Sequence, residues 1–347
     1  MSGIVVSYAG RMPVTLLTGY LGSGKTTLLN RLLPTRAFAR AVVVINEFGD
    51  VPLDPLVVEK TDHEITVLEN GCLCCDVQSH VEGVIGRLFG QRATRLLAFD
   101  RMLIETSGIA DPAPIMQMLL NQPSVNKDFR LENVITVVDA VHGLKQIAEH
   151  EEAYKQVVLA DRLIVSKADL CDAAQLAELE RQLARLNPLA TQTLAHNGNV
   201  PPESVLGAAV DDGARSTRRW FDGLRELEDT RDQRMGLDGS QHIQGVSACS
   251  LVCEHALSWQ ALHGWITQLC AKYGEQLLRL KGIAELVDAR VPVAIHGVHH
   301  VFHQSQALPH LEGWRGTRLV LILRHADAVT IGASWEALVN GPRLLPA

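Results

Sequence analysis

The sequence has no apolar run that approaches the roughly 20 residues needed to cross a bilayer. Its first twelve residues lack the charged start and apolar core of a secretory signal. Basic residues are also too few for a nucleic-acid-binding face, because 32 Lys and Arg stand against 39 Asp and Glu, a formal net charge of −7. We therefore expect a cytoplasmic protein that binds neither membranes nor nucleic acids.

A disulfide framework is absent as well. Three of the seven cysteines lie within residues 72–75, whereas small secreted domains distribute paired cysteines along the chain. No internal repeat or low-complexity tract stands out. With 347 residues and a 47% hydrophobic share, the chain is long enough for two domains with buried cores, in which the cysteines are thiols.

Residues 19–26 (GYLGSGKT) match the phosphate-binding pattern G-x-x-x-x-G-K-[ST] at every fixed position. An apolar run precedes this loop and a helical pattern follows it up to Pro34, which is the context that the motif requires. Backbone amides of such a loop surround phosphates, Lys25 reaches the β- and γ-phosphates, and the Thr26 hydroxyl binds Mg²⁺. The predicted phosphate-binding residues of a nucleoside triphosphate site are Gly22, Ser23, Gly24, Lys25, Thr26 and Thr27.

The order of apolar runs predicts an α/β fold. Up to about residue 195, short apolar runs alternate with helical stretches, which is typical of a mostly parallel sheet covered by helices. The predicted strands are 14–18, 41–45, 65–68, 101–105, 134–139, 162–165 and 191–195. This first domain spans 1–200, and a linker with one helix near 220–227 spans 201–240. Strands at 246–252, 291–300 and 319–323 and a helix at 259–269 predict a smaller α+β domain over 241–347.

Polar residues follow the fourth and sixth predicted strands, at the edge where open α/β sheets bind ligands. In residues 105–108 (ETSG), Glu105 is expected to contact Mg²⁺ through a water, and the Gly108 N–H to lie near the γ-phosphate. In residues 166–169 (SKAD), which begin with Ser166, Asp169 can accept hydrogen bonds from N1–H and the exocyclic amine of guanine, while the Lys167 stem covers the ring. Adenine offers no such pair of donors, so GTP is the expected nucleotide.

Five motifs in one order give the chain a specific resemblance. They are the phosphate-binding loop and residues 46–49 (NEFG), 71–75 (GCLCC), 105–108 (ETSG) and 166–169 (SKAD). The chain resembles the CobW-type metallochaperone GTPases over nearly its whole length. The resemblance implies a GTPase domain that binds a transition metal at the cysteine loop when GTP is present. It then delivers the metal to a client metalloenzyme or metal-cofactor biosynthesis protein.

Cys72, Cys74 and Cys75 can turn three thiolates inward from one loop. Thiolates suit Zn²⁺ and Cu(I) and, less strongly, Co²⁺ or Fe²⁺, so a divalent transition metal (Zn²⁺, Co²⁺ or Fe²⁺) is the expected cargo. Packing or a redox role for the Cys74–Cys75 pair is the alternative. Glu47 and Asp54 are the expected nucleotide-responsive carboxylates, near Mg²⁺ or near the attacking water, with solvated loop charges as the alternative.

Two alternatives to a metallochaperone remain open. A nucleotide-dependent metal sensor would use the same residues without transferring metal. A small-molecule kinase would need a lid with arginines, and no Arg-rich stretch separates Glu105 from Asp169. Since no arginine of the core motifs is placed as a finger, unassisted GTP hydrolysis is expected to be slow. The metal, the client and the oligomeric state stay open.

Two groups of residues in the second domain favour a structural role. His296, His299, His300 and His303 would alternate between the two faces of a strand, so four ligands cannot converge there without a turn. A metal site formed by a pair of them is the alternative. Cys249, Cys253 and His255 are expected to share one strand face in or near the core.

Overall fold

The computed structural model describes residues 5–6, 10–46, 65–68, 77–206, 245–302 and 305–340 of the chain. The chain divides into two compact units, Ala9–Asp212 and a second one that combines Met1–Tyr8 with Gly213–Ala347. The N-terminal strand therefore belongs with the C-terminal unit, whereas the sequence analysis assigns it to a first domain over 1–200. The predicted helix near 220–227 lies outside the described residues.

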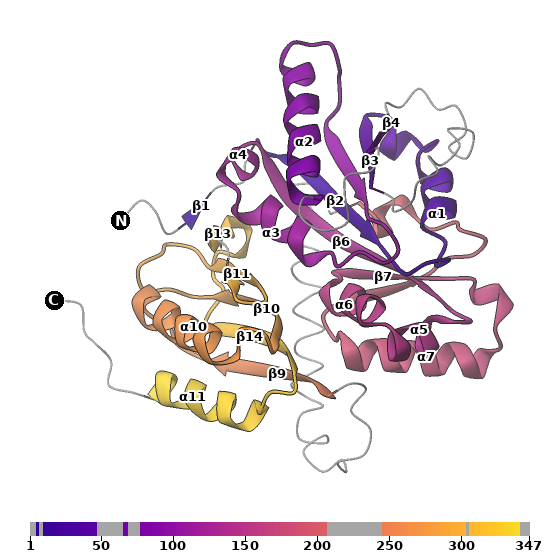
Figure 1. The fold of residues 1–347 in the computed structure, drawn as a ribbon. Helices are drawn as coiled ribbons and strands as arrows, with labels where there is room; N and C mark the ends of the chain where they lie inside the picture. The colour runs from indigo at the N-terminus through magenta and orange to yellow at the C-terminus, as the bar shows by residue number, and fades with distance from the viewer. Residues whose placement is uncertain are drawn as a thin grey trace. The chain divides into compact units, whose positions relative to one another are not determined.

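A parallel sheet forms the centre of the first unit (Figure 1). Its described strands run in the order β4-β3-β5-β2-β6-β7-β8, and every neighbouring pair is parallel. The strands are β2 Met12–Thr18, β3 Ala41–Asn46, β4 Ile65–Leu68, β5 Arg101–Glu105, β6 Phe129–Asp139, β7 Arg162–Ser166 and β8 Thr191–Leu194. This confirms the predicted mostly parallel sheet. Strand β6 starts at Phe129 rather than at 134, because its polar first half pairs with β2 and has no apolar run to reveal it.

Helices cover this sheet. They are α1 Lys25–Leu32, α2 Val77–Ala93, α3 Ala113–Asn121, α4 Pro123–Asn126, α5 Gly143–Glu149, α6 Glu151–Leu159 and α7 Ala173–Leu186, with 3-10 turns η1 Arg36–Phe38, η2 Ala168–Leu170 and η3 Pro202–Ser204. Helix α1 buries Leu28, Leu29 and Leu32 in one cluster with side chains of β2, β3 and β5. The start of α1 is therefore held at the carboxyl end of β2.

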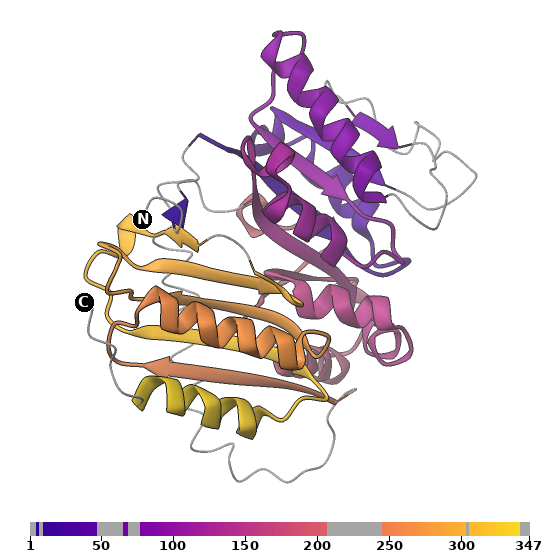
Figure 2. The same ribbon diagram turned by 60° about the vertical axis from the view of Figure 1, so that its left-hand side comes forward.

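The second unit is a mainly antiparallel sheet in the order β1-β13-β11-β10-β14-β9, with β12 paired to β11. Only the β1–β13 pair is parallel among the described pairs. The elements are β1 Val5–Val6, β9 Val246–Cys253, α10 Trp259–Tyr273, β10 Leu277–Ala284, β11 Val293–Val298, β12 Val301–Phe302, β13 Ser305–Ala307, η6 Pro309–Leu311, β14 Thr317–Arg324 and α11 Ala328–Asn340. Figure 2 shows α10 and α11 side by side on one face of this sheet, where Trp265 and Trp335 meet edge to face.

The sequence analysis misses β10 and α11 of this unit, as well as the short strands β1, β12 and β13. Strand β10 lies between β11 and β14 in the sheet, but its sequence LLRLKGIA contains two cations and a glycine, which argue against a central strand. Helix α11 carries β-branched residues and a glycine, which weaken a helical pattern. None of the helices in the described ranges is long and apolar enough to span a membrane.

The glycine in β10, Gly282, is required by the close approach of the neighbouring strand, and its substitution gives a stability prediction. A Cβ at this position would lie 2.3 Å from the Arg318 carbonyl oxygen and 2.8 Å from Leu319 Cα on the paired strand β14. We expect Gly282→Ala to lower the free energy of unfolding of the C-terminal unit by about 1–3 kcal/mol, the usual cost of overpacking. Urea denaturation followed by tryptophan fluorescence measures it, because all five tryptophans of the chain belong to the C-terminal unit.

Gly264 provides the control. It lies inside α10 with open space around the added methyl group, so Gly264→Ala should raise the free energy of unfolding by about 0.5–1 kcal/mol. Equal, small effects of the two substitutions would contradict the close approach of β10 and β14.

Candidate functional site

The phosphate-binding loop connects β2 to α1. Gly19, Gly22 and Gly24 all have positive φ angles, 147°, 74° and 97°, which favour glycine. A Cβ on Gly19 would lie 2.4 Å from the Val137 carbonyl oxygen, so the start of the loop is also pressed against β6. Ser23 is fully buried in the turn, with no hydrogen-bond partner for its Oγ among the described residues. The loop thus has the conformation that the motif requires.

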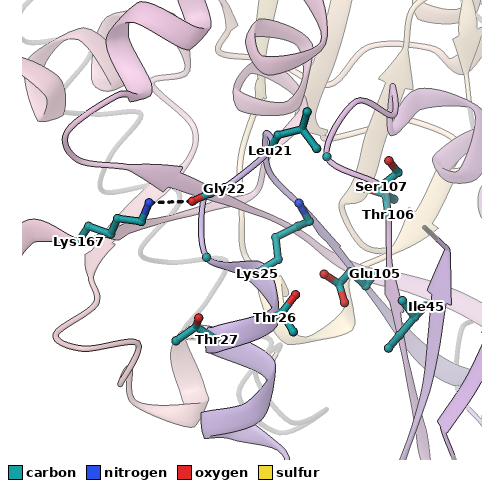
Figure 3. Close-up of a pocket in the computed structure, with 12 residues that line it drawn as sticks. Leu21, Gly22, Lys25, Thr26, Thr27, Ile45, Glu105, Thr106, Ser107 and Lys167 are labelled. Carbon is teal, nitrogen blue, oxygen red and sulfur yellow. Dashed lines mark hydrogen bonds between the residues drawn. The ribbon is translucent and has the colours of Figure 1, made fainter. Parts of the chain in front are cut away.

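The loop opens into a cavity of about 330 Å³, shown in Figure 3. Three of the predicted motifs contribute to its walls. The lining residues are Leu21, Gly22, Gly24, Lys25, Thr26, Thr27, Ile45, Glu105, Thr106, Ser107, Gly108 and Lys167. The residues predicted to bind the phosphates, Mg²⁺ and the γ-phosphate therefore line one cavity. Lys167 also lines it and comes from residues 166–169 (SKAD), the predicted base motif.

Lys25, Thr26 and Glu105 form the polar floor of the cavity. Lys25 Nζ donates to the Gly19 carbonyl oxygen at 2.7 Å, which holds the ammonium group over its own loop. Glu105 ends β5 and is 6% exposed, and its carboxylate points toward Thr26 (Figure 3). A hydroxyl and a carboxylate are the oxygen ligands that Mg²⁺ takes beside phosphates, so the chemistry of the pair fits that ion.

The segment after β5 is held against the phosphate-binding loop. The Thr106 N–H donates to the Leu17 carbonyl oxygen at 2.9 Å, and Thr106 Oγ1 donates to Thr18 Oγ1 at 2.8 Å. A Cβ on Gly108 would lie 2.8 Å from the Leu21 backbone nitrogen, so only glycine fits there. Gly108 is thus in direct contact with the loop that is predicted to hold the phosphates.

The base motif is also tied to the phosphate-binding loop. Ser166 Oγ donates to the Ser23 carbonyl oxygen at 2.6 Å. Lys167 has a left-handed backbone, φ 56°, and its Nζ donates to the Gly22 carbonyl oxygen at 2.8 Å. Asp169 follows on η2 and is exposed at the same end of the sheet, where it is accessible to a nucleotide base.

Asp139 is a site residue that the sequence analysis did not select. It is 1% exposed at the end of β6 and accepts hydrogen bonds from Lys167 Nζ at 2.6 Å and from the backbone N–H groups of Val141 and His142. Burial raises the pKa of Asp139, but the hydrogen bonds from Lys167, His142 and Val141 outweigh it, so the pKa lies below its ordinary value. Its position at a strand end was a usable signal.

Two further segments, which carry no sequence motif, contact the phosphate-binding loop or the helix that follows it. Tyr20 stacks on His150, which precedes α6, with ring centroids 4.7 Å apart. The loop after β8 places Gly198 beside α1, where a Cβ would lie 2.9 Å from Thr27 Cγ2. The second segment follows the last strand of the sheet and so lies at the ligand-binding edge.

Several predicted site residues lie outside the described residues. They are Glu47, Asp54, Cys72, Cys74 and Cys75, and their roles stay predictions. Within the described ranges, no group of three or more His, Cys, Asp or Glu side chains is placed to hold a metal ion.

The prediction that Cys249, Cys253 and His255 share one strand face is partly wrong. Cys253 is 2% exposed and Cys249 packs against the same core, as expected, but His255 lies beyond the end of β9 because the strand stops at Cys253. Strand β11 ends at Val298, and His299 has a left-handed backbone in the turn that follows. His303 lies outside the described residues.

Known protein families match both units. The CobW/HypB/UreG nucleotide-binding domain matches residues 13–193, and the cobalamin synthesis protein CobW C-terminal domain matches residues 246–339. The zinc chaperone CobW of Sinorhizobium sp is 29% identical over 361 residues, which cover 95% of this chain and 98% of that protein. The zinc chaperone YjiA of Escherichia coli (strain K12) is 36% identical over 187 residues, but the match spans only 54% of this chain and 58% of YjiA.

A solved structure shares the fold. The crystal structure of Zn(II)-bound YjiA GTPase from E. coli superposes with a TM-score of 0.66 at 21% identity, covering 94% of this chain and 99% of that one. The family matches confirm the resemblance drawn from the five motifs. The chain belongs to the CobW/HypB/UreG family of nucleotide-binding proteins and carries the CobW C-terminal domain.

Proposed function

We propose that this protein is a cytoplasmic, GTP-hydrolysing metallochaperone, which binds a divalent transition metal at Cys72, Cys74 and Cys75 when GTP is bound and releases it to a client metalloenzyme or metal-cofactor biosynthesis protein. The observation that carries the proposal is the single cavity in which the phosphate-binding loop, the Glu105 segment and Lys167 meet. Relatives named as zinc chaperones support a metal cargo, with Zn²⁺ as the first candidate.

The residues of the cavity divide the work of phosphoryl transfer. Lys25 turns from the Gly19 carbonyl oxygen to the β- and γ-phosphates, where its charge is more strongly stabilised. Thr26 and Glu105 would hold Mg²⁺, which supplies positive charge against the phosphate oxygens when bound. The Gly108 N–H senses the γ-phosphate. Glu47 and Asp54 act near Mg²⁺ or the attacking water, which leaves the catalytic carboxylate to be identified between them.

Lys25→Ala tests the hydrolytic step. Because the variant loses the cation that offsets charge on the transferred phosphate, its rate of phosphate release from Mg-GTP should fall by about 100-fold or more. A single-turnover assay with protein in excess measures it. Lys145→Ala, which removes an exposed lysine of α5, is the matched control and should keep the wild-type rate. A rate for Lys25→Ala within threefold of the control would contradict the assignment.

Asp169→Asn tests the base. The amide would donate to the C2 carbonyl oxygen of xanthine, where guanine carries an amine, so the preference should move from GDP to xanthosine diphosphate. We expect the Kd for GDP to rise by about 100-fold, for two hydrogen bonds to a charged acceptor. Calorimetric titration with both nucleotides measures it. Asp100→Asn, at the opposite end of β5 in an exposed ion pair with Arg40, is the control.

The cargo site is tested by metal titration. The reduced protein is titrated anaerobically with Zn²⁺, Co²⁺ and Fe²⁺ against a chelator, in Mg-GTP and in Mg-GDP. The triple variant Cys72→Ser/Cys74→Ser/Cys75→Ser should bind the metal roughly 100-fold more weakly or worse. Even the loss of a group that only hydrogen-bonds to a metal ligand lowers metal affinity by up to about 100-fold.

The control removes as many thiols elsewhere, through Cys171→Ser/Cys249→Ser/Cys270→Ser, whose cysteines are half-buried. Burial raises the pKa of the Cys270 thiol to about 11, which makes it a poor metal ligand. Affinity that ignores the nucleotide, or that survives the loss of residues 72, 74 and 75, would exclude a GTP-gated cargo site.

A further inference from the structure

Gln156 of α6 is buried beneath the segment that follows β5. Its side chain is 0% exposed, and Nε2 donates to the Gly108 carbonyl oxygen at 3.1 Å and to the Ala110 carbonyl oxygen at 3.0 Å. Its own backbone carbonyl accepts from Thr136 Oγ1 of β6 at 2.6 Å. Gln156 therefore bonds the central sheet through its backbone and, through its side chain, two carbonyl groups of the segment that contains the proposed γ-phosphate sensor.

This amide is costly to bury. Its Oε1 has no hydrogen-bond partner in the described part of the chain, and an unpaired buried acceptor is unfavourable. A methionine of similar volume would fill the same space without that cost. The two donor contacts are thus what a glutamine provides here that an apolar side chain does not.

The contacts of Gln156 complete the fixation of Gly108. The segment is held before Gly108 by Thr106, whose N–H bonds the Leu17 carbonyl oxygen. After Gly108, the Ala110 N–H donates to the Ser107 carbonyl oxygen at 3.1 Å, and Asp111 forms a partly exposed ion pair with Lys155 at 3.0 Å. Without Gln156, the peptide planes that follow Gly108 and Ala110 would lose the described hydrogen bonds to their carbonyl oxygens, and Gly108 would be held by the Ser107–Ala110 turn alone.

We propose that Gln156 is the positioning residue of the γ-phosphate sensor: it holds the Gly108 segment in the orientation that favours GTP over GDP. This inference rests on the proposed GTPase function, in which the γ-phosphate is the one part of the nucleotide that the Gly108 N–H contacts. A donor that is oriented before the ligand arrives costs no ordering at binding. Loss of Gln156 therefore weakens binding of a nucleotide with a γ-phosphate more than binding of one without it.

The test compares GDP with a non-hydrolysable GTP analogue, each with Mg²⁺, by calorimetric titration. Gln156→Met should lower the ratio of analogue affinity to GDP affinity by about tenfold, the size of one to two hydrogen bonds, and change GDP affinity less than threefold. Single-turnover hydrolysis of GTP should slow in parallel.

Asn187, which follows α7, offers a matched control because its side chain bonds to α6, the helix that contains Gln156. It is also a fully buried amide, and its Nδ2 donates to the carbonyl oxygens of Val157, Val158 and Ala160 at the C-terminal end of α6, but not to the Gly108 segment. Asn187→Leu should lower the melting temperature as Gln156→Met does, but keep the wild-type ratio of the two affinities. A ratio that falls equally in both variants would reduce Gln156 to a structural residue.

A second substitution covers the case in which Gln156→Met does not fold. Gln156→Glu keeps the volume, and its protonated form restores one of the two donors, so the affinity ratio should recover as the pH is lowered through the pKa of the introduced carboxyl. A ratio equal to the wild type in a folded Gln156 variant overturns this inference alone. A wild-type protein that binds neither nucleotide overturns the proposed function and, with it, this inference.

Discussion

The site depends on two hydrogen bonds that tie carbonyl groups of the phosphate-binding loop to the last residue of β7, Ser166, and to Lys167, which follows it. In a planar trans peptide, the C=O and the following N–H point in opposite directions. Lys167 holds the Gly22 carbonyl and so orients the Ser23 N–H, while Ser166 holds the Ser23 carbonyl and so orients the Gly24 N–H. The predicted base-recognition segment thereby fixes the conformation of the predicted phosphate-binding loop, in which the Ser23 N–H donates to the Tyr20 carbonyl oxygen at 3.1 Å.

Asp139 makes this arrangement electrostatically stable. Lys25 and Lys167 both donate to carbonyl oxygens of one short loop, and two ammonium groups so placed repel each other. The buried carboxylate offsets the charge of Lys167, and its low pKa keeps it ionised at neutral pH. Because the folded-state pKa lies below the unfolded one, this contribution to stability is present above about pH 4 and is lost as the pH falls through the folded-state pKa.

Sequence patterns predicted the parts of the fold and site that are local. The strands β4 and β5 were predicted with their observed bounds, and each described motif of the nucleotide site lies at a strand end as expected. Gln156 could not be predicted, because it is one polar residue inside a helix and its role exists only where α6 crosses the Gly108 segment. Strand β10 was missed for a similar reason: Gly282 is required by the backbone of β14, a neighbour distant in sequence.

The pairing of β5, β3 and β4 connects the nucleotide site to the chain segments that lead to the predicted metal ligands Cys72, Cys74 and Cys75. Glu105 pairs with Ile45, which lines the same cavity, and the next residue of β3, Asn46, pairs with Leu68 at the end of β4. The chain leaves β3 directly before Glu47 and leaves β4 shortly before Cys72. Under the proposed function, a shift of Glu105 on binding of phosphate and Mg²⁺ would be passed to the end of β3. From there it would reach the end of β4 through the pairing of Asn46 with Leu68. Because protein interiors have low compressibility, the proposed dependence of metal binding on GTP would require no contact between the nucleotide and the thiols.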